Sequence, residues 1–325
     1  MRDCGRERKG ACSTAGRMRQ PEEGITRIRR APGELHRSGG AQGIRHESPG
    51  EAMTDPIVVG VDGSGRSLRA LLWAAQEASL HHCPLRIVHV LSLEPGPVPD
   101  SRIVSEATAI AKQAHPELEV ISAEFDGTPA AAFLSESERA HTVALGAKGR
   151  GSFGTVMLGS VALQVVGHAA SPVVVVNHVP LDQGRVTVGA DGSAHSQAAL
   201  EYAFKEASLR GAQLQALYAW SPSGGPAPVS LAQDEIDAEH RRALQEWLAP
   251  LRQDHPDVEV VEELAHESPV LALARASDRS DLLVVGSRGR GGFRGLALGS
   301  VSHALLQYSL CPMAVIRPRT QPARS

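Results

Sequence analysis

The sequence predicts two α/β domains of the doubly wound type, each with a parallel sheet that carries helices on both faces. Three observations support this fold class. The chain has 325 residues, which is enough for two domains of ordinary size. A segment of about 130 residues is present twice, and this indicates two similar domains rather than a solenoid of many short repeats. Within each copy, short apolar segments alternate with helical ones, a pattern typical of strand–helix–strand units with right-handed crossovers.

The repeat is clearest at the beginning of each copy. Residues 57–64 read Ile-Val-Val-Gly-Val-Asp-Gly-Ser, and residues 186–193 read Val-Thr-Val-Gly-Ala-Asp-Gly-Ser. The offset is 129 residues here and 140 residues further along, where His115-Pro116 matches His255-Pro256. The second copy is therefore longer by the difference of 11 residues, which lie between Trp220 and that second His-Pro pair.

The strands and helices of the first copy follow from composition and periodicity. The predicted strands are mostly rich in Val and Ile, and several are nearly continuous in apolar character, as in parallel strands covered on both faces. They are Ile57–Val61, Leu85–Leu91, Leu118–Ala123, Thr142–Leu145 and Pro172–Val176. The intervening segments are expected to be helices, as where Leu68, Leu71 and Leu72 follow helical spacing. These helices are Ser67–Leu80, Ser101–Ala114, Pro129–Ala140 and Ser160–Ala169.

Two prolines predict where the third helix of each copy begins. Pro129 follows Thr128, and Pro269 follows Ser268. Proline is tolerated in the first turn of a helix, and Thr and Ser are favoured N-caps. We therefore expect both helices to begin at the proline, with Thr128 and Ser268 as their caps.

The first 52 residues belong to neither copy. They contain 11 Lys and Arg, 7 Asp and Glu, 9 Gly and almost no apolar periodicity, so we expect a disordered extension. A transit peptide or basic arm is disfavoured by the acidic residues and by the lack of an amphipathic stripe. An extension upstream of a true start at Met53 is the favoured interpretation, because a clean strand follows that residue. The domains are then expected at residues 54–178 and 185–318.

Charge and apolar content exclude several classes of protein. A net charge of −3 gives no overall electrostatic basis for binding nucleic acid. No apolar segment approaches the roughly 18–20 residues that span a bilayer, and the N-terminus lacks the apolar core of a signal peptide. The four cysteines, at positions 4, 12, 83 and 311, have no metal-ligand spacing and are expected to be free thiols. These features predict a soluble, cytoplasmic protein without a membrane or nucleic-acid partner and without a bound metal.

A long glycine spacing follows the fourth predicted strand of both copies. Residues 146–160 and residues 286–300 both read G-x2-G-x9-G-S. Glycine allows close approach of the backbone to a phosphate and allows positive φ, and the final Gly-Ser pair opens a helix whose N–H groups favour an anion. Ser160 and Ser300 can add hydroxyl donors. A flexible loop with an ordinary serine cap is the structural alternative, but the same spacing in two otherwise diverged copies favours phosphate binding.

An aspartate follows the first strand of each copy. Asp62 and Asp191 are expected at the carboxyl edge of the sheet, where ligands bind in open α/β folds. Such a carboxylate can accept hydrogen bonds from a ribose or a base, or it can form an Asx turn or helix cap. The aspartate alone does not distinguish these two roles. Because it is expected beside the glycine loop, we favour the role in binding a ligand.

Several familiar motifs are absent. The P-loop requires GxxxxGK[ST], whereas Lys148 and Arg288 lie between the first two glycines of their loops. No GxGxxG or SGGxDS follows the first strand, and no paired carboxylates or Ser/His/Asp set indicate catalysis. No residue is predicted to be catalytic.

Residues 56–318 resemble a tandem universal stress protein of the ATP-binding class. The V-G-x-D-G-S turns, both complete glycine loops and the strand that runs into Gly286 carry the resemblance. The resemblance implies two Rossmann-like domains, each with five parallel strands in the order 3-2-1-4-5. It also implies ATP, with or without Mg²⁺, with its phosphates on the glycine loop and its adenine near the ends of the first two strands.

Carried over by match, the resemblance implicates ten nucleotide-binding residues in each copy. In the first copy they are Gly60, Asp62, Val90, Gly146, Gly149, Arg150, Gly151, Gly159, Ser160 and Val161. In the second copy they are Gly189, Asp191, Ala219, Gly286, Gly289, Arg290, Gly291, Gly299, Ser300 and Val301.

The resemblance also implies association through the last strand. Pro172–Val176 and Pro312–Ile316 are expected to pair across a pseudo-twofold axis, so that one chain imitates a dimer; whether two chains form a homodimer stays open. The predicted function is an ATP-binding regulatory protein of the stress response, acting on protein partners that the sequence does not name. The alternatives are a slow ATPase or phosphotransferase of the same fold and a structural dimer module without ligand, against which the intact glycines argue.

Overall fold

The computed structural model of the chain describes residues 54–91, 102–147, 158–178, 182–220, 231–291 and 296–318, together with strand β1 (Thr26–Arg27). The strands of the first copy are β2 (Ile57–Gly60), β3 (Leu85–Leu91), β4 (Val120–Asp126), β5 (Thr142–Gly146) and β6 (Val173–Val176). Those of the second copy are β7 (Arg185–Gly189), β8 (Gln213–Ala219), β9 (Val260–Ala265), β10 (Leu282–Gly286) and β11 (Met313–Ile316).

All of these strands form one continuous sheet in the order β1-β4-β3-β2-β5-β6-β11-β10-β7-β8-β9. Each copy contributes five parallel strands in the order 3-2-1-4-5, which confirms the predicted fold class. Strand β1 adds in parallel to the outer edge, where Thr26 lies opposite Ala123. The rest of the N-terminal extension lies outside the described residues, so its disorder stays a prediction.

The helices cover the sheet on both faces. They are α1 (Gly65–Leu80), α2 (Arg102–Ala114), α3 (Pro129–Glu136), α4 (Ser160–His168), α5 (Ala194–Arg210), α6 (Leu231–Asp254), α7 (Pro269–Ser277) and α8 (Ser300–Tyr308). Helices α1, α2, α5 and α6 share one apolar cluster with the sheet, and α3, α4, α7 and α8 share the other. The core of Val, Leu, Ile and Ala is therefore layered on either side of the strands, as a parallel sheet requires.

The helix starts at Pro129 and Pro269 and the N-cap positions of Thr128 and Ser268 are confirmed. Neither cap side chain makes a capping hydrogen bond. The backbone carbonyls of the two cap residues still accept the first intrahelical bonds, from Ala132 and Ala272 at 3.2 and 3.0 Å.

Helix α3 is shorter than the periodicity predicts. It ends at Glu136 and continues as a 3-10 turn, η1 (Ser137–Arg139), rather than as α-helix to Ala140. The hydroxyl of Ser137 donates to the carbonyl of Leu134 at 2.7 Å and accepts the N–H of Ala170 at 3.0 Å. A serine that bonds nearby backbone in this way competes with the helical ladder.

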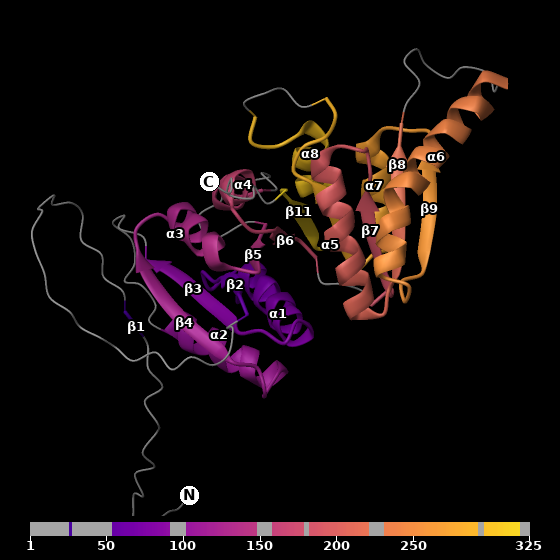
Figure 1. The fold of residues 1–325 in the computed structure, drawn as a ribbon. Helices are drawn as coiled ribbons and strands as arrows, with labels where there is room; N and C mark the ends of the chain where they lie inside the picture. Colours follow the sequence, from indigo (N-terminus) through magenta and orange to yellow (C-terminus); the bar gives the residue numbers. More distant parts are fainter. Residues whose placement is uncertain are drawn as a thin grey trace, which may run out of the picture.

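The two copies meet along β6 and β11, which pair antiparallel at the centre of the sheet (Figure 1). Val174 lies opposite Ala314, and both strands are fully buried. The expected pairing of the last strands is thus confirmed within the chain. It gives each apolar edge strand a partner, as an edge of this kind requires.

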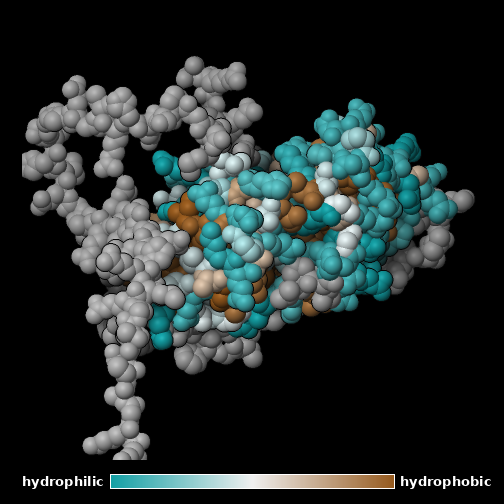
Figure 2. All heavy atoms as spheres, turned by 90° about the horizontal axis from the view of Figure 1, so that it is seen from below, coloured by the Kyte–Doolittle hydropathy of each residue, from teal (hydrophilic) through white to brown (hydrophobic). Residues whose placement is uncertain are grey.

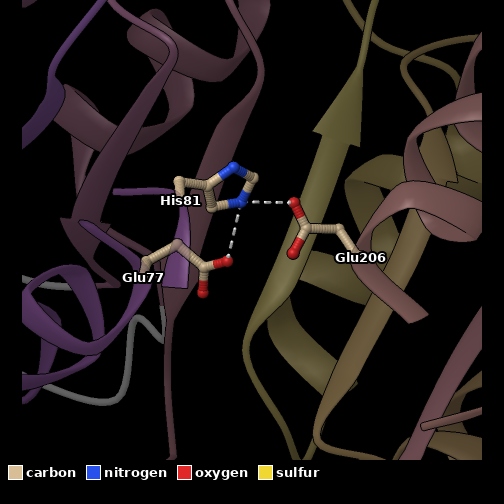
Figure 3. A group of neighbouring side chains, drawn as sticks. All are labelled: Glu77, His81 and Glu206. Carbon is tan, nitrogen blue, oxygen red and sulfur yellow. Dashed lines mark hydrogen bonds and ion pairs between the residues drawn. The ribbon is translucent and has the colours of Figure 1, made fainter. Parts of the chain in front are cut away.

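A buried charged cluster joins the copies on the α1–α5 side of this seam. His81, at the end of α1, lies between Glu77 of α1 and Glu206 of α5 (Figure 3). Its Nε2 is 3.1 Å from Glu206 Oε1 and 3.4 Å from Glu77 Oε1. The guanidinium of Arg210 donates to Glu77 at 2.5 and 2.7 Å and also bonds to Glu206. Glu77 and Glu206 are equivalent in the repeat, and so are His81 and Arg210, so the cluster follows the pseudo-twofold symmetry.

The charges of this cluster set its pKa values. Burial disfavours the charged form of His81, but its hydrogen bonds to Glu206 and Glu77 outweigh this and raise its pKa to about 9. Burial likewise acts against charged Glu206, but His81 and Arg210 lower its pKa to about 2. Burial and the neighbouring Glu206 carboxylate raise the pKa of Glu77. The two cations therefore hold at least one buried carboxylate ionised between the copies.

The surface is polar over most of the face seen from below. Figure 2 shows hydrophilic residues interrupting several separate apolar areas on this face. Exposed apolar side chains of the described chain include Leu271, Leu296 and Tyr308. Among the described residues, no helix is long and apolar enough to cross a membrane.

Candidate functional site

The carboxyl ends of β7, β8 and β10 enclose a cavity of about 380 Å³, here named the second-copy pocket. Strands β7 and β10 are neighbours, yet the helices that follow them, α5 and α8, lie on opposite faces of the sheet. In doubly wound sheets this arrangement opens a crevice beyond the strand ends, where ligands bind. The volume is in the range of small-molecule sites.

One side of the second-copy pocket is apolar. Its residues come from β8, α7, β10 and the segment before α8. They are Leu217, Ala219, Pro269, Leu273, Val285, Leu296 and Leu298. Such a wall can cover the flat face of an aromatic ring. Of this set only Ala219 is implicated by the resemblance, because apolar residues at the ends of strands carry no motif of their own.

Much of the remaining lining comes from the glycine loop and the beginning of α8. Every residue that the resemblance implicates in this loop of the second copy lines the pocket: Gly286, Gly289, Arg290, Gly291, Gly299, Ser300 and Val301. Gly299 is the N-cap of α8, and no side chain caps this helix. The N–H of Gly299 donates to the Ser287 carbonyl at 2.8 Å and closes the loop. The first N–H groups of α8 and the helix dipole therefore favour an anion at this end of the pocket.

Two glycines of the second-copy loop, Gly286 and Gly289, are required for close approach. None of the four glycines that the structure describes in this loop lies in the left-handed region, so for these the expectation of positive φ is wrong. A Cβ on Gly289 would lie 2.4 Å from Asp191 Oδ2, and a Cβ on Gly286 would lie 2.7 Å from the backbone of His195. Positive φ occurs instead in the preceding turn, at Gly192 with φ of 76°.

Asp191 connects the first turn to the glycine loop. Its Oδ1 accepts the N–H of Ser193 at 2.9 Å, which is an Asx turn, and its Oδ2 accepts the N–H of Arg290 at 3.1 Å. Ser193 in turn caps α5. The Asx-turn alternative is thus confirmed. A carboxylate oxygen has two lone pairs, so both atoms keep acceptor capacity for a ligand, and that role stays a prediction.

Basic side chains lie on the second glycine loop and next to it. Arg288 and Arg290 line the second-copy pocket. The Arg290 guanidinium also lies 5.6 Å from the ring centroid of Trp247, on helix α6 in the region where the second copy is longer. His195 Nδ1 is 2.9 Å from Ser287 Oγ. Burial and the neighbouring guanidiniums of Arg288 and Arg317 lower the pKa of His195.

The sequence profile of the universal stress protein family matches this chain twice, at residues 53–177 and 184–317. The chain belongs to the universal stress protein family. It is 35% identical over 288 residues to a universal stress protein of Mycolicibacterium smegmatis, an alignment that covers 81% of this chain and 97% of the relative. It is 36% identical over 284 residues to one of Mycobacterium tuberculosis, with 80% of this chain and 96% of the relative covered.

Solved structures of universal stress proteins share the fold. A universal stress protein from Archaeoglobus fulgidus matches 82% of this chain with 97% of its own, at 22% identity and a TM-score of 0.53. A putative universal stress protein from Pseudomonas aeruginosa matches 83% of this chain with 96% of its own, at 17% identity and a TM-score of 0.57. At these identities the likeness concerns the fold alone.

The first copy of this universal stress protein repeats three contacts of this geometry. The N–H of Gly159 donates to the Ala147 carbonyl at 2.7 Å, as Gly299 does to Ser287. A Cβ on Gly146 would lie 2.9 Å from the backbone of Arg66, the counterpart of the contact at Gly286. Asp62 accepts the N–H of Ser64 at 2.9 Å in the same Asx turn.

The remaining predicted residues of the first copy divide into two groups. Gly60, Val90, Ser160 and Val161 lie at the ends of β2 and β3 and at the start of α4, as their counterparts do in the second copy. Gly149, Arg150 and Gly151 lie outside the described residues. The nucleotide-binding roles of all these residues stay predictions.

Proposed function

We propose that this universal stress protein binds an adenine nucleotide, in the first place ATP, in the second-copy pocket and at the equivalent place in the first copy. Occupancy is proposed to regulate contacts with protein partners in a stress response. One observation carries the proposal: a single cavity of about 380 Å³ joins an apolar wall to the open N-terminus of a helix. An adenine nucleotide has the same division into a flat apolar base and an anionic tail.

The two ends of the pocket suit the two ends of the ligand. The base is proposed to lie against Leu217 and Ala219 of β8 and Leu273 of α7, which form part of the apolar wall. The phosphates are proposed to lie at Gly289 and Ser300, where backbone N–H groups, a hydroxyl and the helix dipole converge. Asp191 is proposed to accept a hydrogen bond from a ribose hydroxyl.

The residues that line the second-copy pocket could hold Mg²⁺ only together with the phosphates of a nucleotide. Among the described residues that line the second-copy pocket, Asp191 is the one carboxylate, and both of its oxygens already accept backbone N–H groups. Mg²⁺ is commonly held by one or two carboxylates together with substrate phosphates. Asp191 would therefore hold the ion only together with the nucleotide.

Titration calorimetry of nucleotide-stripped protein tests the proposal. ATP should bind more tightly than either adenosine or inorganic triphosphate, because only ATP fills both ends of the pocket. Protein that shows no heat of binding with ATP would rule the proposal out. Released phosphate, measured in the same samples, separates the regulatory function from a slow ATPase: the regulatory function predicts that bound ATP stays intact.

A further inference from the structure

Three basic side chains gather where the second glycine loop closes. They are His195 at the start of α5, Arg288 in the loop and Arg317 directly after β11. Burial and the neighbouring Arg288 lower the pKa of Arg317, and burial and both arginines lower that of His195. The three side chains are therefore close enough for their charges to interact.

No carboxylate of the described chain forms an ion pair with Arg288 or Arg317. The Nε atoms of both arginines are buried and have no hydrogen-bond acceptor among the described residues. The parts of the second copy outside the description, residues 221–230, 292–295 and 319–325, contain no Asp or Glu. Both side chains are half-buried, but a buried N–H group is normally hydrogen-bonded, so these two Nε groups are suited to an acceptor from outside the chain, such as an anion.

The order of the strands sets the direction in which an anion would reach them. The sheet runs β8-β7-β10-β11, with Leu217 and Ala219 of the apolar wall on β8 and the two arginines after β10 and β11. Arg288 lines the pocket, and its Cα would lie 3.3 Å from a Cβ on Gly299, the N-cap of α8. A nucleotide with its base on the β8 side would therefore extend its phosphate chain past α8 towards Arg288 and Arg317.

We propose that Arg288 and Arg317 form a subsite for the terminal phosphate of the nucleotide, so that the affinity of the second copy increases with the number of phosphates. This rests on the proposed function, because it extends the same pocket. The repeat places Asn177 at the position equivalent to Arg317, and its side chain donates to the carbonyl of Leu306 instead. The substitution Arg317→Asn therefore gives the second copy the residue of the first.

The competing role for Arg317 is structural. Its Nη2 donates to the carbonyl of Ala297 at 2.8 Å, two residues before the N-cap of α8. An arginine that only holds the loop in place would support every ligand of the pocket equally. A phosphate ligand would support ATP most and adenosine least. The two roles therefore differ in the ratio of affinities rather than in the affinity for ATP alone.

Calorimetry on the full, nucleotide-stripped chain with ATP, ADP, AMP and adenosine separates these roles. In Arg317→Asn, the ATP affinity of one of the two sites should fall roughly ten- to hundredfold, which is the effect of losing one charge-assisted hydrogen bond. The affinities for AMP and adenosine should change little. Arg317→Lys, which keeps the charge, should retain most of the ATP preference. Arg252→Gln is the matched control. Arg252 lies on α6, and the positive charge that this substitution removes pairs with Glu262 on β9. Melting temperatures show that each variant folds.

The other outcomes reject either the subsite or the proposed function. An equal loss for all four ligands in Arg317→Asn would show a structural clamp, and an unchanged ATP affinity would show that Arg317 does not reach the phosphates. Either result rejects the subsite while the proposed function stands. Wild-type protein that binds none of the four ligands would reject the proposed function, and the subsite with it.

Discussion

Ser300 stands at the first position of α8 and is not its cap. Gly299 is the N-cap, and no side chain bonds the free N–H groups. We therefore expect Ser300→Ala to leave the melting temperature unchanged. If the hydroxyl donates to a phosphate, the variant should lose roughly ten- to hundredfold in ATP affinity at that site and little in adenosine affinity. Ser160→Ala should behave in the same way in the first copy.

Calorimetry with both ligands and a thermal melt check this prediction. The ratio of ATP to adenosine affinity is the decisive quantity, because a general disturbance of the loop would weaken both ligands. A lower melting temperature with an unchanged ratio would mean that the serine serves only the helix.

The spacing of glycines was enough to predict the polar side of the pocket, but not the reason for each glycine. A Cβ on Gly289 would meet Asp191, whereas a Cβ on Gly291 would meet nothing within 4 Å. The difference arises because Asp191 reaches the loop from another strand of the sheet, 98 positions away in sequence numbering. The apolar wall was missed for a related reason. Residues such as Leu273 become pocket residues only when α7 packs beside β8.

At the scale of elements, periodicity predicted the strands and helices that bury one face or both. It could not predict the charged cluster between α1 and α5. Glu77 with His81, and Glu206 with Arg210, are each four residues apart, a spacing equally typical of an exposed helical surface. Only the packing of the two copies buries these four side chains together. Such contacts depend on the pairing of β6 with β11 and carry no local signal.

The cluster predicts a loss of stability at alkaline pH. The pKa of His81 is raised to about 9 from an ordinary value of 6.5. Its contribution to the free energy of unfolding is therefore complete below about pH 6.5 and is lost as the pH rises through about 9. Urea unfolding across this range should show stability falling in the wild type, with a weaker fall in His81→Gln.

His82→Asn is the matched control for this titration. His82 is the exposed neighbour of His81 and has φ of 50°, a conformation that asparagine tolerates. The His82→Asn variant should lose stability at alkaline pH to the same extent as the wild type. The same slope in His81→Gln and the wild type would show that the cluster does not titrate in this window.

At the scale of the whole molecule, the repeat predicted two similar domains, and the resemblance implied that their last strands join them. An apolar last strand needs a partner, and a second copy in the same chain supplies it. The result is one continuous sheet (Figure 1). The charged cluster between α1 and α5 adds a second contact between the copies. The inserted residues of the second copy were located by the repeat. The contact of helix α6 with the site, through Trp247 and Arg290, was not predicted.

A chain that begins at Met53 should keep its fold and its nucleotide affinity. Among the described residues, the segment before Met53 contributes only β1, two residues paired with the outer edge of β4. The melting temperature and the ATP affinity of the shortened chain, compared with those of the full chain, check this. A large drop in melting temperature would mean that the N-terminal extension packs on the body of the protein.

The number of ATP molecules bound per chain tests most directly whether the repeat carries a nucleotide site in each copy. Calorimetry of nucleotide-stripped wild-type protein should give two. Gly289→Ala, which sets a methyl group against Asp191, should give one, whereas Gly291→Ala, which meets open space, should keep two with a smaller loss of affinity. A wild-type chain that binds a single ATP molecule, or none, would contradict a site in each copy.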